Sequence, residues 1–147
     1  MGPIHYRSTA DALGGLASGS VQAAFVTVGL AAPQVQGGKL RALATTGTAR
    51  SGVLSDVPTL AEAGYPRLDF TAWFGFVAPA RTPDGVLDAL NAAVVKAVQA
   101  PEVRAKLEAA GFRMVGSSRS DFARLIQSDA ARWGAIVKAT GFQATTN

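Results

Sequence analysis

The feature that most constrains this fold is a strand, helix and strand pattern between residues 21 and 46. Residues 21–28, VQAAFVTV, are β-prone and almost continuously apolar, which is typical of a strand buried on both faces. LAAPQVQ follows as a short helix that Gly37 and Gly38 close, and residues 40–46, LRALATT, are again strand-like. A βαβ unit implies parallel strands, so the sequence predicts an α/β fold.

Capping signals place helices on both sides of this unit. Ser8 or Thr9 is expected to cap a helix that ends near Gly19, because hydroxyl side chains there accept a bond from the first turn. Asp56 or Thr59 is expected to cap a second helix, of one or two turns.

The second half of the chain repeats the alternation. Residues 68–80, LDFTAWFGFVAPA, are a long β-prone stretch, and Pro83 lies in the first turn of a predicted helix. Ala100-Pro101 ends that helix and begins another, and Ser118 or Ser120 opens the last one. The predicted apolar side of the last helix holds Phe122, Leu125, Ile126, Trp133, Ile136 and Val137.

Composition excludes several classes of protein. With 147 residues, 48% of them hydrophobic and 16% charged, the chain is long and apolar enough for one globular domain with a core. The net charge of +4 favours anionic partners, but the basic residues are scattered singly, so no nucleic-acid partner is expected. Cysteine is absent, and no apolar run reaches the ~18–20 residues of a membrane span.

The start of the chain carries no signal-peptide pattern, since MGPIHYRS lacks an apolar stretch. A strand-like segment begins there abruptly, and we expect an N-terminal portion to precede it in the whole protein.

Evidence for an enzyme is confined to one residue. His5 is the only histidine, and no base-orienting partner is evident near it in sequence, so a structural role is the simpler interpretation. The nucleophile motif GxSxG is absent, and no set of His, Asp and Glu has metal-ligand spacing. The sequence therefore predicts no catalytic residue, no metal and no cofactor.

A binding site for an anion is better supported. The first turn of a helix leaves backbone N–H groups free, and the helix dipole adds partial positive charge there. Ser8, Thr9 and Ala10 form such a turn, and Tyr6 and Arg7 flank it. A carboxylate would accept bonds from the amides, the hydroxyls and the Arg7 guanidinium. The simpler alternative is that a hydroxyl only caps the helix.

Two further segments are candidates for the same ligand. Thr27 and Val28 lie at the carboxyl end of a predicted parallel strand, where open α/β sheets bind ligands, although an ordinary strand-to-helix turn explains them equally well. Trp73 and Phe74 are aromatic and could line a ligand, but aromatic side chains more often belong to the core.

Ordered motifs along nearly the whole chain resemble one family, the extracytoplasmic solute receptors of the tripartite tricarboxylate transporters, also called Bug receptors. The segments that carry the resemblance are Tyr6-Arg7, Gly19-x-Val21 with Phe25, GKLRALA at 38–44, DVPTLAEAG at 56–64, WFGFVAPARTP at 73–83, Leu90-Asn91-Ala92-Ala93, Pro101-Glu102-Val103-Arg104, and Trp133-Gly134 with Val137-Lys138. Each motif alone is weak, and their joint order is specific.

The resemblance implies a type II periplasmic-binding-protein fold, in which two α/β lobes, with parallel or mixed sheets flanked by helices, close over a small carboxylated solute. Such a receptor is periplasmic, needs no cofactor and delivers its mono- or dicarboxylate to integral membrane transporter subunits. By this resemblance, residues 1–70 are expected to form second-lobe structure. Residues 71–147 would be a crossover strand with strands and helices returning to the first lobe. The chain would thus be a partial two-lobe receptor lacking its N-terminal part.

Three departures from the family pattern bear on the ligand. Ser8 stands where the family commonly has glycine, Val26-Thr27 where it often has aspartate and a small polar residue, and Gly29-Leu30 where it often has Pro-Ser. The loss of the carboxylate at Val26 implies a less polar cleft. The alternative function is a non-binding, oligomeric module of the same fold, which self-associates through exposed apolar surface.

Overall fold

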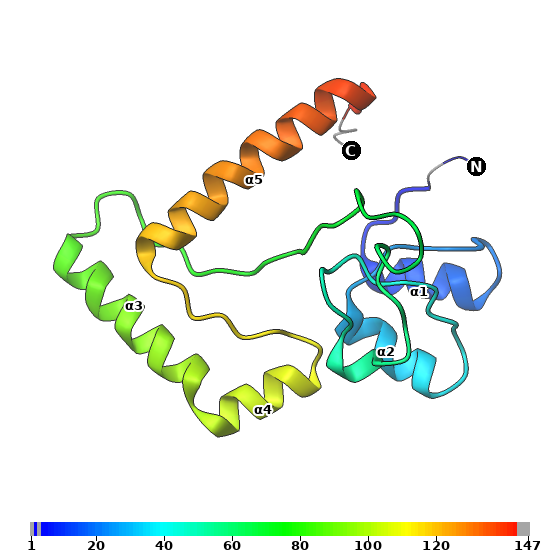
Figure 1. Cartoon of the computed structure of the whole chain (residues 1–147), viewed down its shortest axis with the longest axis horizontal. Helices are drawn as coiled ribbons and strands as arrows, with labels where there is room; N and C mark the ends of the chain where they lie inside the picture. Colours follow the sequence, from blue (N-terminus) through cyan, green and yellow to red (C-terminus); the bar gives the residue numbers. More distant parts are fainter. Residues whose placement is uncertain (1, 3, 144–147) are drawn as a thin grey trace. The chain divides into compact units, whose positions relative to one another are not determined.

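The computed structural model describes residues 2 and 4–143 of the chain and divides them into two compact units. Unit 1 combines residues up to Phe76 with Pro101–Met114, and unit 2 combines Val77–Ala100 with the residues from Val115 onward. The helices are α1 (Thr9–Ala17), α2 (Val28–Gln36), the 3-10 helix η1 (Gly52–Leu54), α3 (Asp84–Gln99), α4 (Pro101–Ala109) and α5 (Arg119–Thr140) (Figure 1). The assignment of residues 1–70 and 71–147 to receptor lobes stays a prediction.

Helix ends follow the capping signals closely. Ser8 is the N-cap of α1 and accepts a bond from the Asp11 amide, and Ser118 does the same for α5 through the Asp121 amide. Gly141 ends α5 in the left-handed conformation at φ 64°, which glycine adopts without the strain that a Cβ would bring. The predictions for these two helices are confirmed.

The predicted sheets do not form among the described residues. The segments 21–28, 40–46 and 68–80 contain no paired strands, and the one β contact among the described residues is an isolated parallel bridge between Thr45 and Thr59. In that bridge the Thr45 amide donates to the Pro58 carbonyl, and the Leu60 amide donates to the Thr45 carbonyl, each over 2.8 Å. A strand needs a neighbour for its amides and carbonyls along its length; beyond this bridge the Phe70 amide donates to the Thr46 carbonyl over 2.9 Å, and no paired ladder forms among the described residues.

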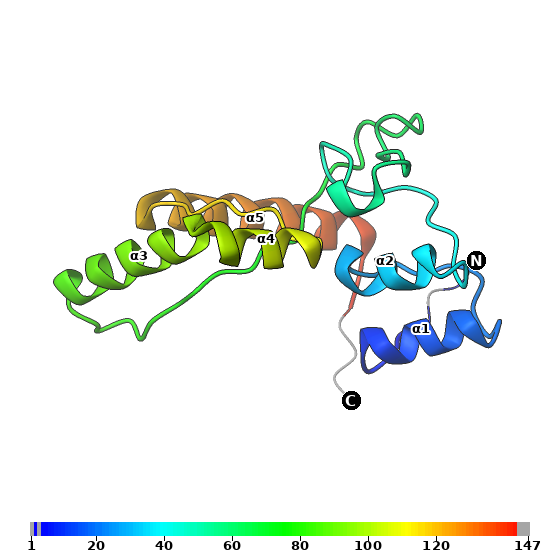
Figure 2. The ribbon, with the colours of Figure 1, turned by 90° about the horizontal axis from the view of Figure 1, so that it is seen from below.

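Unit 1 is organised around a small apolar core. Ala32, Leu54 and Val57 are buried, and α2 and α4 both contact η1. In both views α1 and α2 lie next to each other (Figures 1 and 2). Gly29, in the first turn of α2, lies so close to the end of α4 that a Cβ added to it would be 2.3 Å from the Ala110 carbonyl oxygen. This approach between segments about eighty residues apart requires glycine at that position.

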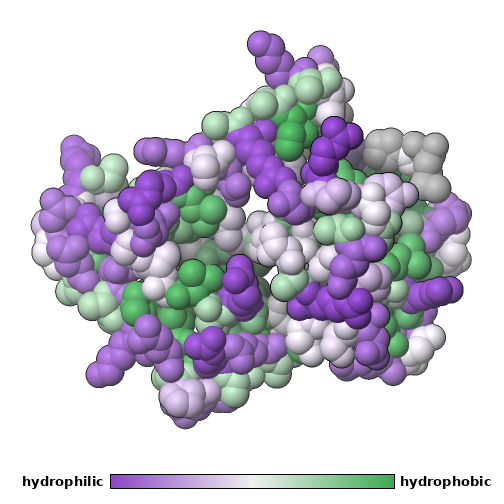
Figure 3. Space-filling model, in the orientation of Figure 1, coloured by the Kyte–Doolittle hydropathy of each residue, from purple (hydrophilic) through white to green (hydrophobic). Residues whose placement is uncertain are grey.

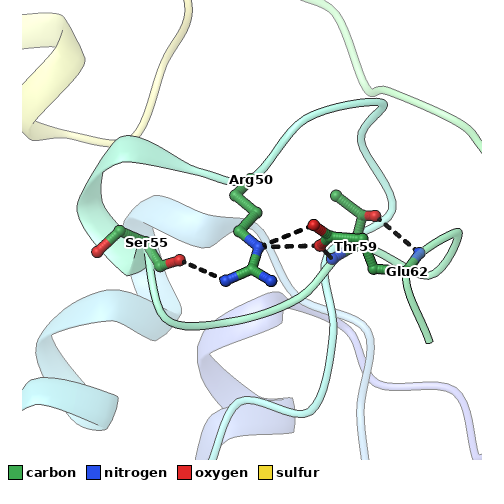
Figure 4. A network of polar contacts seen from close by, with 4 residues as sticks. All are labelled: Arg50, Ser55, Thr59 and Glu62. Atoms are coloured by element: carbon green, nitrogen blue, oxygen red, sulfur yellow. Dashed lines mark hydrogen bonds and ion pairs between the residues drawn. The ribbon is translucent and has the colours of Figure 1, made fainter.

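The predicted helix after Thr59 is a capped turn rather than a helix. The Glu62 amide donates to Thr59 Oγ1 over 3.1 Å, while the Thr59 amide donates to Glu62 Oε2 over 2.8 Å (Figure 4). Arg50 holds this pair from outside, since its Nε lies 2.9 Å from Glu62 Oε2 and its Nη1 donates to the Ser55 carbonyl. Thr59 itself is 3% exposed, so the cap is anchored next to the core.

Unit 2 consists mainly of α3 and α5. Arg119, the first residue of α5, bonds Asp84 over 2.7 Å and Asp88 over 2.5 Å, which ties the beginning of α5 to the beginning of α3. No described residue of this unit is buried. The apolar side of α5 that the sequence predicts as packed is open to a large extent, with Trp133 and Val137 each 43% exposed. Hydrophobic residues are also visible on the molecular surface in the space-filling view (Figure 3).

None of the helices formed by the described residues combines the length and the apolar character that crossing a bilayer requires.

Candidate functional site

Five of the predicted ligand-binding residues lie at the beginning of α1: Thr9 and Ala10 start the helix, Ser8 is its N-cap, and Tyr6 and Arg7 precede it. Ser8 donates its hydroxyl hydrogen to Asp11 Oδ2 over 2.9 Å and accepts from the Asp11 amide over 3.2 Å. The simpler interpretation is therefore correct for Ser8, whose side chain caps the helix. Thr9 and Ala10 begin the helix, so their amides have no carbonyl partner within it and remain donors for an incoming group.

Asp11 is the residue of this turn that the sequence analysis missed. It places a carboxylate in the first turn of α1, where the helix dipole favours negative charge. The spacing of Ser8 and Asp11 is the capping pattern of a hydroxyl residue followed three positions later by an acid, so the signal was present in the sequence. Asp11 lowers the positive potential that a ligand carboxylate would meet, and the exposed Arg7 raises it.

Tyr6 is held against α1. Its side chain is half-buried, and Gly15 beneath it is buried. A Cβ built at Gly15 would lie 2.3 Å from the Tyr6 hydroxyl oxygen, so the ring rests on the bare backbone of the second turn. Tyr6 is thus a fixed neighbour of the α1 first turn, whereas Arg7 projects into solvent.

The second candidate segment, Thr27 and Val28, lies at the start of α2. Thr27 is the N-cap residue but makes no capping bond with its side chain, and it is exposed. Val28 packs against the core of unit 1. A Cβ at Gly111 would lie 3.1 Å from the Gly29 nitrogen, so the turn after α4 covers part of this helix end. Thr27 is consequently the better-placed ligand contact of the two.

The aromatic segment is at the surface. Phe74 is 73% exposed and Trp73 39%, so the interpretation of this stretch as core is wrong for the described structure. Phe74 makes an edge-to-face contact with Phe112, with ring centroids 5.5 Å apart and planes at 78°. All nine predicted ligand-binding residues belong to unit 1, on three separate segments.

Two cavities lined by described residues lie elsewhere. One, of about 220 Å³, is lined by Leu13, Gly14 and Ala17 of α1 and by Gln34, Lys39 and Leu40. The other, of about 570 Å³, lies in unit 2 between α3 and the beginning of α5. None of the nine predicted residues lines either cavity, so their role stays a prediction.

The positions of the described side chains give little support for a catalytic or metal-binding site. His5 is exposed, and within residues 2 and 4–143 no three His, Asp or Glu side chains gather closely enough to bind a metal ion.

Comparison with protein families gives one clear result. The model of the tripartite tricarboxylate transporter family receptor matches residues 2–142, nearly the whole chain.

Curated relatives agree with this match. A protein encoded in the tcbD–tcbE intergenic region of Pseudomonas sp. (strain P51) is 33% identical over 91% of this chain and 40% of its own length. Protein BugT of Bordetella pertussis is 30% identical over 94% of this chain and 42% of its own length. The chain thus spans about two fifths of the length of these relatives.

Several solved structures have a similar backbone. A periplasmic transporter superposes with a TM-score of 0.83 at 33% identity, covering 90% of this chain and 44% of that one. MatC from Rhodopseudomonas palustris, solved with bound malate, superposes at 0.75 with 31% identity, covering 91% of this chain and 47% of MatC. The periplasmic binding protein BugD, at 23% identity and a TM-score of 0.79, shares the fold.

Proposed function

The chain belongs to the tripartite tricarboxylate transporter receptor family, and from that membership we propose that it is part of a receptor that captures a small carboxylate outside the cytoplasm and presents it to membrane transporter subunits. Membership confirms the resemblance that the ordered motifs indicated, and it supports the proposal that the protein is a receptor rather than an enzyme. The family fold is that of periplasmic binding proteins.

One observation supports the proposed class of solute. MatC, with which this chain aligns over 91% of its length, holds malate, a dicarboxylate. We propose that the solute of this chain is likewise a mono- or dicarboxylate, received at the amides of Thr9 and Ala10 and at the Thr9 hydroxyl, with Arg7 as the charged partner. Tyr6 and Thr27 are the proposed flanking contacts, with Ser8, Val28, Trp73 and Phe74 completing the predicted set.

Arg7 supplies the attraction in this arrangement. It is exposed and directly precedes the capped turn, so its guanidinium is free to reach a carboxylate that docks on the helix. A guanidinium pairs with both carboxylate oxygens at once, which the helix amides alone cannot do. The competing charge is Asp11, whose carboxylate already accepts the Ser8 hydroxyl.

Isothermal titration of the chain with malate tests this proposal, with acetate and a neutral polyol as comparison solutes. We expect malate to bind, acetate to bind more weakly because it offers one carboxylate, and the polyol not to bind. If no carboxylate gives a heat of binding or changes the melting temperature, the proposal is wrong for this chain.

A second candidate function rests on a different observation. No described residue of unit 2 is buried, and α5 exposes Trp133, Ile136 and Val137 by about two fifths each. An apolar helix face of this kind favours association, and the alternative is a non-binding module that self-associates through it. Light scattering separates the two candidates, because the module forms a stable oligomer whose mass is indifferent to carboxylates.

A further inference from the structure

Two adjacent glycines in the middle of α1 have different surroundings. Gly15 is buried under the Tyr6 side chain, and a Cβ there would lie 2.3 Å from the Tyr6 hydroxyl oxygen and 2.8 Å from ring carbon Cζ. Gly14 is exposed, and a Cβ added to it would meet nothing within 4 Å. The same glycine-to-alanine substitution can therefore be made at two neighbouring positions, and only the new Cβ at position 15 would contact Tyr6.

Neither glycine is needed for the backbone of α1. Both lie inside a regular helix, and neither belongs to the glycines with a positive φ angle. In such a position glycine is less favourable than alanine, because it restricts the unfolded chain less. Helix formation alone therefore gives no reason for glycine at position 15, whereas the Tyr6 contact does.

From this contact we infer that Gly15 is a positioning residue, whose missing side chain lets the Tyr6 ring rest on α1 beside the proposed carboxylate site. The inference rests on the proposed function, because the position of the ring affects binding only if a carboxylate binds at Arg7, Thr9 and Ala10. Tyr6 lies directly before Arg7 in the chain, so the ring and the guanidinium flank the same end of α1.

The expected consequence of a Cβ at Gly15 is local. The atom that it meets first is the far end of the Tyr6 side chain, which moves by rotation and does not require the helix to shift. Gly15→Ala should therefore displace Tyr6 and leave α1 folded, while Gly14→Ala should leave Tyr6 in place. A purely structural glycine would show its effect in stability instead.

The first experiment needs no ligand. Tyrosine ring signals of the whole chain are recorded by NMR for the unmodified protein, Gly15→Ala and Gly14→Ala. The chain has two tyrosines, and Tyr65 serves as the internal reference. We expect Gly15→Ala to shift the Tyr6 ring signals alone, and Gly14→Ala to shift neither tyrosine. Unchanged Tyr6 signals in folded Gly15→Ala would overturn the inference.

The second experiment uses malate as the probe. Gly15→Ala should weaken malate binding by about fivefold or more, the factor that follows from losing one contact of hydrogen-bond strength, while Gly14→Ala stays within about twofold of the unmodified protein. In a Tyr6→Ala background, Gly15→Ala should have no further effect on affinity. It should then raise the melting temperature, as we also expect of Gly14→Ala, because alanine is more favourable than glycine inside a helix. Equal affinities for the two alanine variants would contradict the inference.

Failure of the proposed function is distinguishable from failure of this inference. If the unmodified chain binds no malate, the proposed solute is wrong, and the Tyr6 signals alone decide whether Gly15 sets the ring position. If malate binds and Gly15→Ala leaves both the ring signals and the affinity unchanged, the proposed function stands and the positioning role of Gly15 does not.

Discussion

Thr59 and Glu62 cap each other, with the Glu62 amide bonded to the threonine hydroxyl over 3.1 Å and the Thr59 amide bonded to the glutamate carboxylate over 2.8 Å. Arg50 adds an ion pair to the same carboxylate. The reciprocal cap closes the turn that begins at Thr59, and the bridge between Thr59 and Thr45 joins this turn to a segment that the sequence predicts as a strand.

Replacing Thr59 tests this cap. Thr59→Ala leaves the Glu62 amide without its acceptor next to the core, and we expect the free energy of unfolding to fall by about 1 kcal/mol. Thr59→Ser keeps the hydroxyl and should cost less. Urea denaturation measures both variants, and equal losses for alanine and serine would show that the methyl group, and not the cap, stabilises the turn.

The Glu62 carboxylate makes stability depend on pH. Its pKa lies below the ordinary value of 4.5, first because Arg50 donates a hydrogen bond to it and then because the Thr59 amide does. A pKa lowered by folding gives stability that is present above the unfolded value and is lost as the pH falls through the folded value. The melting temperature should therefore decline as the pH is lowered below about 4.5, partly through Glu62.

Glu62→Gln isolates this contribution, because glutamine retains the capping geometry and does not titrate. The variant should show a shallower decline of melting temperature with falling pH. Glu102→Gln is the control, since it removes another carboxylate from unit 1 and leaves the Arg50 contact intact. The same decline in both variants would contradict the assignment of this pH dependence to Glu62.

The close approach of α2 and α4 makes Gly29 sensitive to substitution. In Gly29→Ala the new Cβ would lie 2.3 Å from the Ala110 carbonyl oxygen, a backbone atom that cannot rotate away. We expect a loss of about 1–3 kcal/mol in the free energy of unfolding, the usual cost of overpacking. Gly85→Ala is the matched control, because Gly85 is likewise the second residue of a helix and has open space around it. Equal stability of the two variants would mean that α4 does not pack on Gly29.

Local signals in the sequence predicted most of the helices, although the helix expected after Thr59 is only a capped turn. Ser8 and Ser118 cap α1 and α5 as expected, and Pro101 begins α4 after the break at Ala100. These features depend on neighbouring residues, so a pattern of a few positions contains the information.

Features that depend on distant residues could not be predicted in the same way. The apolar segments 21–27 and 68–80 are β-prone, but pairing needs partner strands, and the described residues provide only the Thr45–Thr59 bridge. The contact of Gly29 with Ala110 joins segments far apart in the chain and leaves no local pattern.

The sequence predicted which residues lie at the beginning of α1, but one charge of the candidate site, the Asp11 carboxylate, was missed. Thr9 and Ala10 do begin a helix, and the Ser8 hydroxyl, for which the sequence left a ligand contact and a helix cap as alternatives, caps it. Asp11 was not among the predicted residues. A carboxylate three positions after a capping serine was readable as part of the cap.

Asp11 is expected to oppose anion binding. Asp11→Asn removes a negative charge from the first turn of α1 while keeping a group that accepts the Ser8 hydroxyl hydrogen. Malate should bind more tightly to this variant, by about two- to fivefold for a solvent-screened charge, and the gain should shrink at high salt. Glu102→Gln, in the first turn of α4, is the control for a general change in net charge. An equal gain in the control would assign the effect to net charge alone.

The central claim is that the beginning of α1 receives a carboxylate, and titration of malate into the unmodified chain and into the double variant Arg7→Ala with Thr9→Ala tests it most directly. Arg81→Ala, which removes an exposed arginine from unit 2, is measured alongside. The account predicts saturable binding to the unmodified chain and to Arg81→Ala, with a loss of about tenfold or more in the double variant. Equal affinity in all three proteins, or binding to none of them, would contradict it.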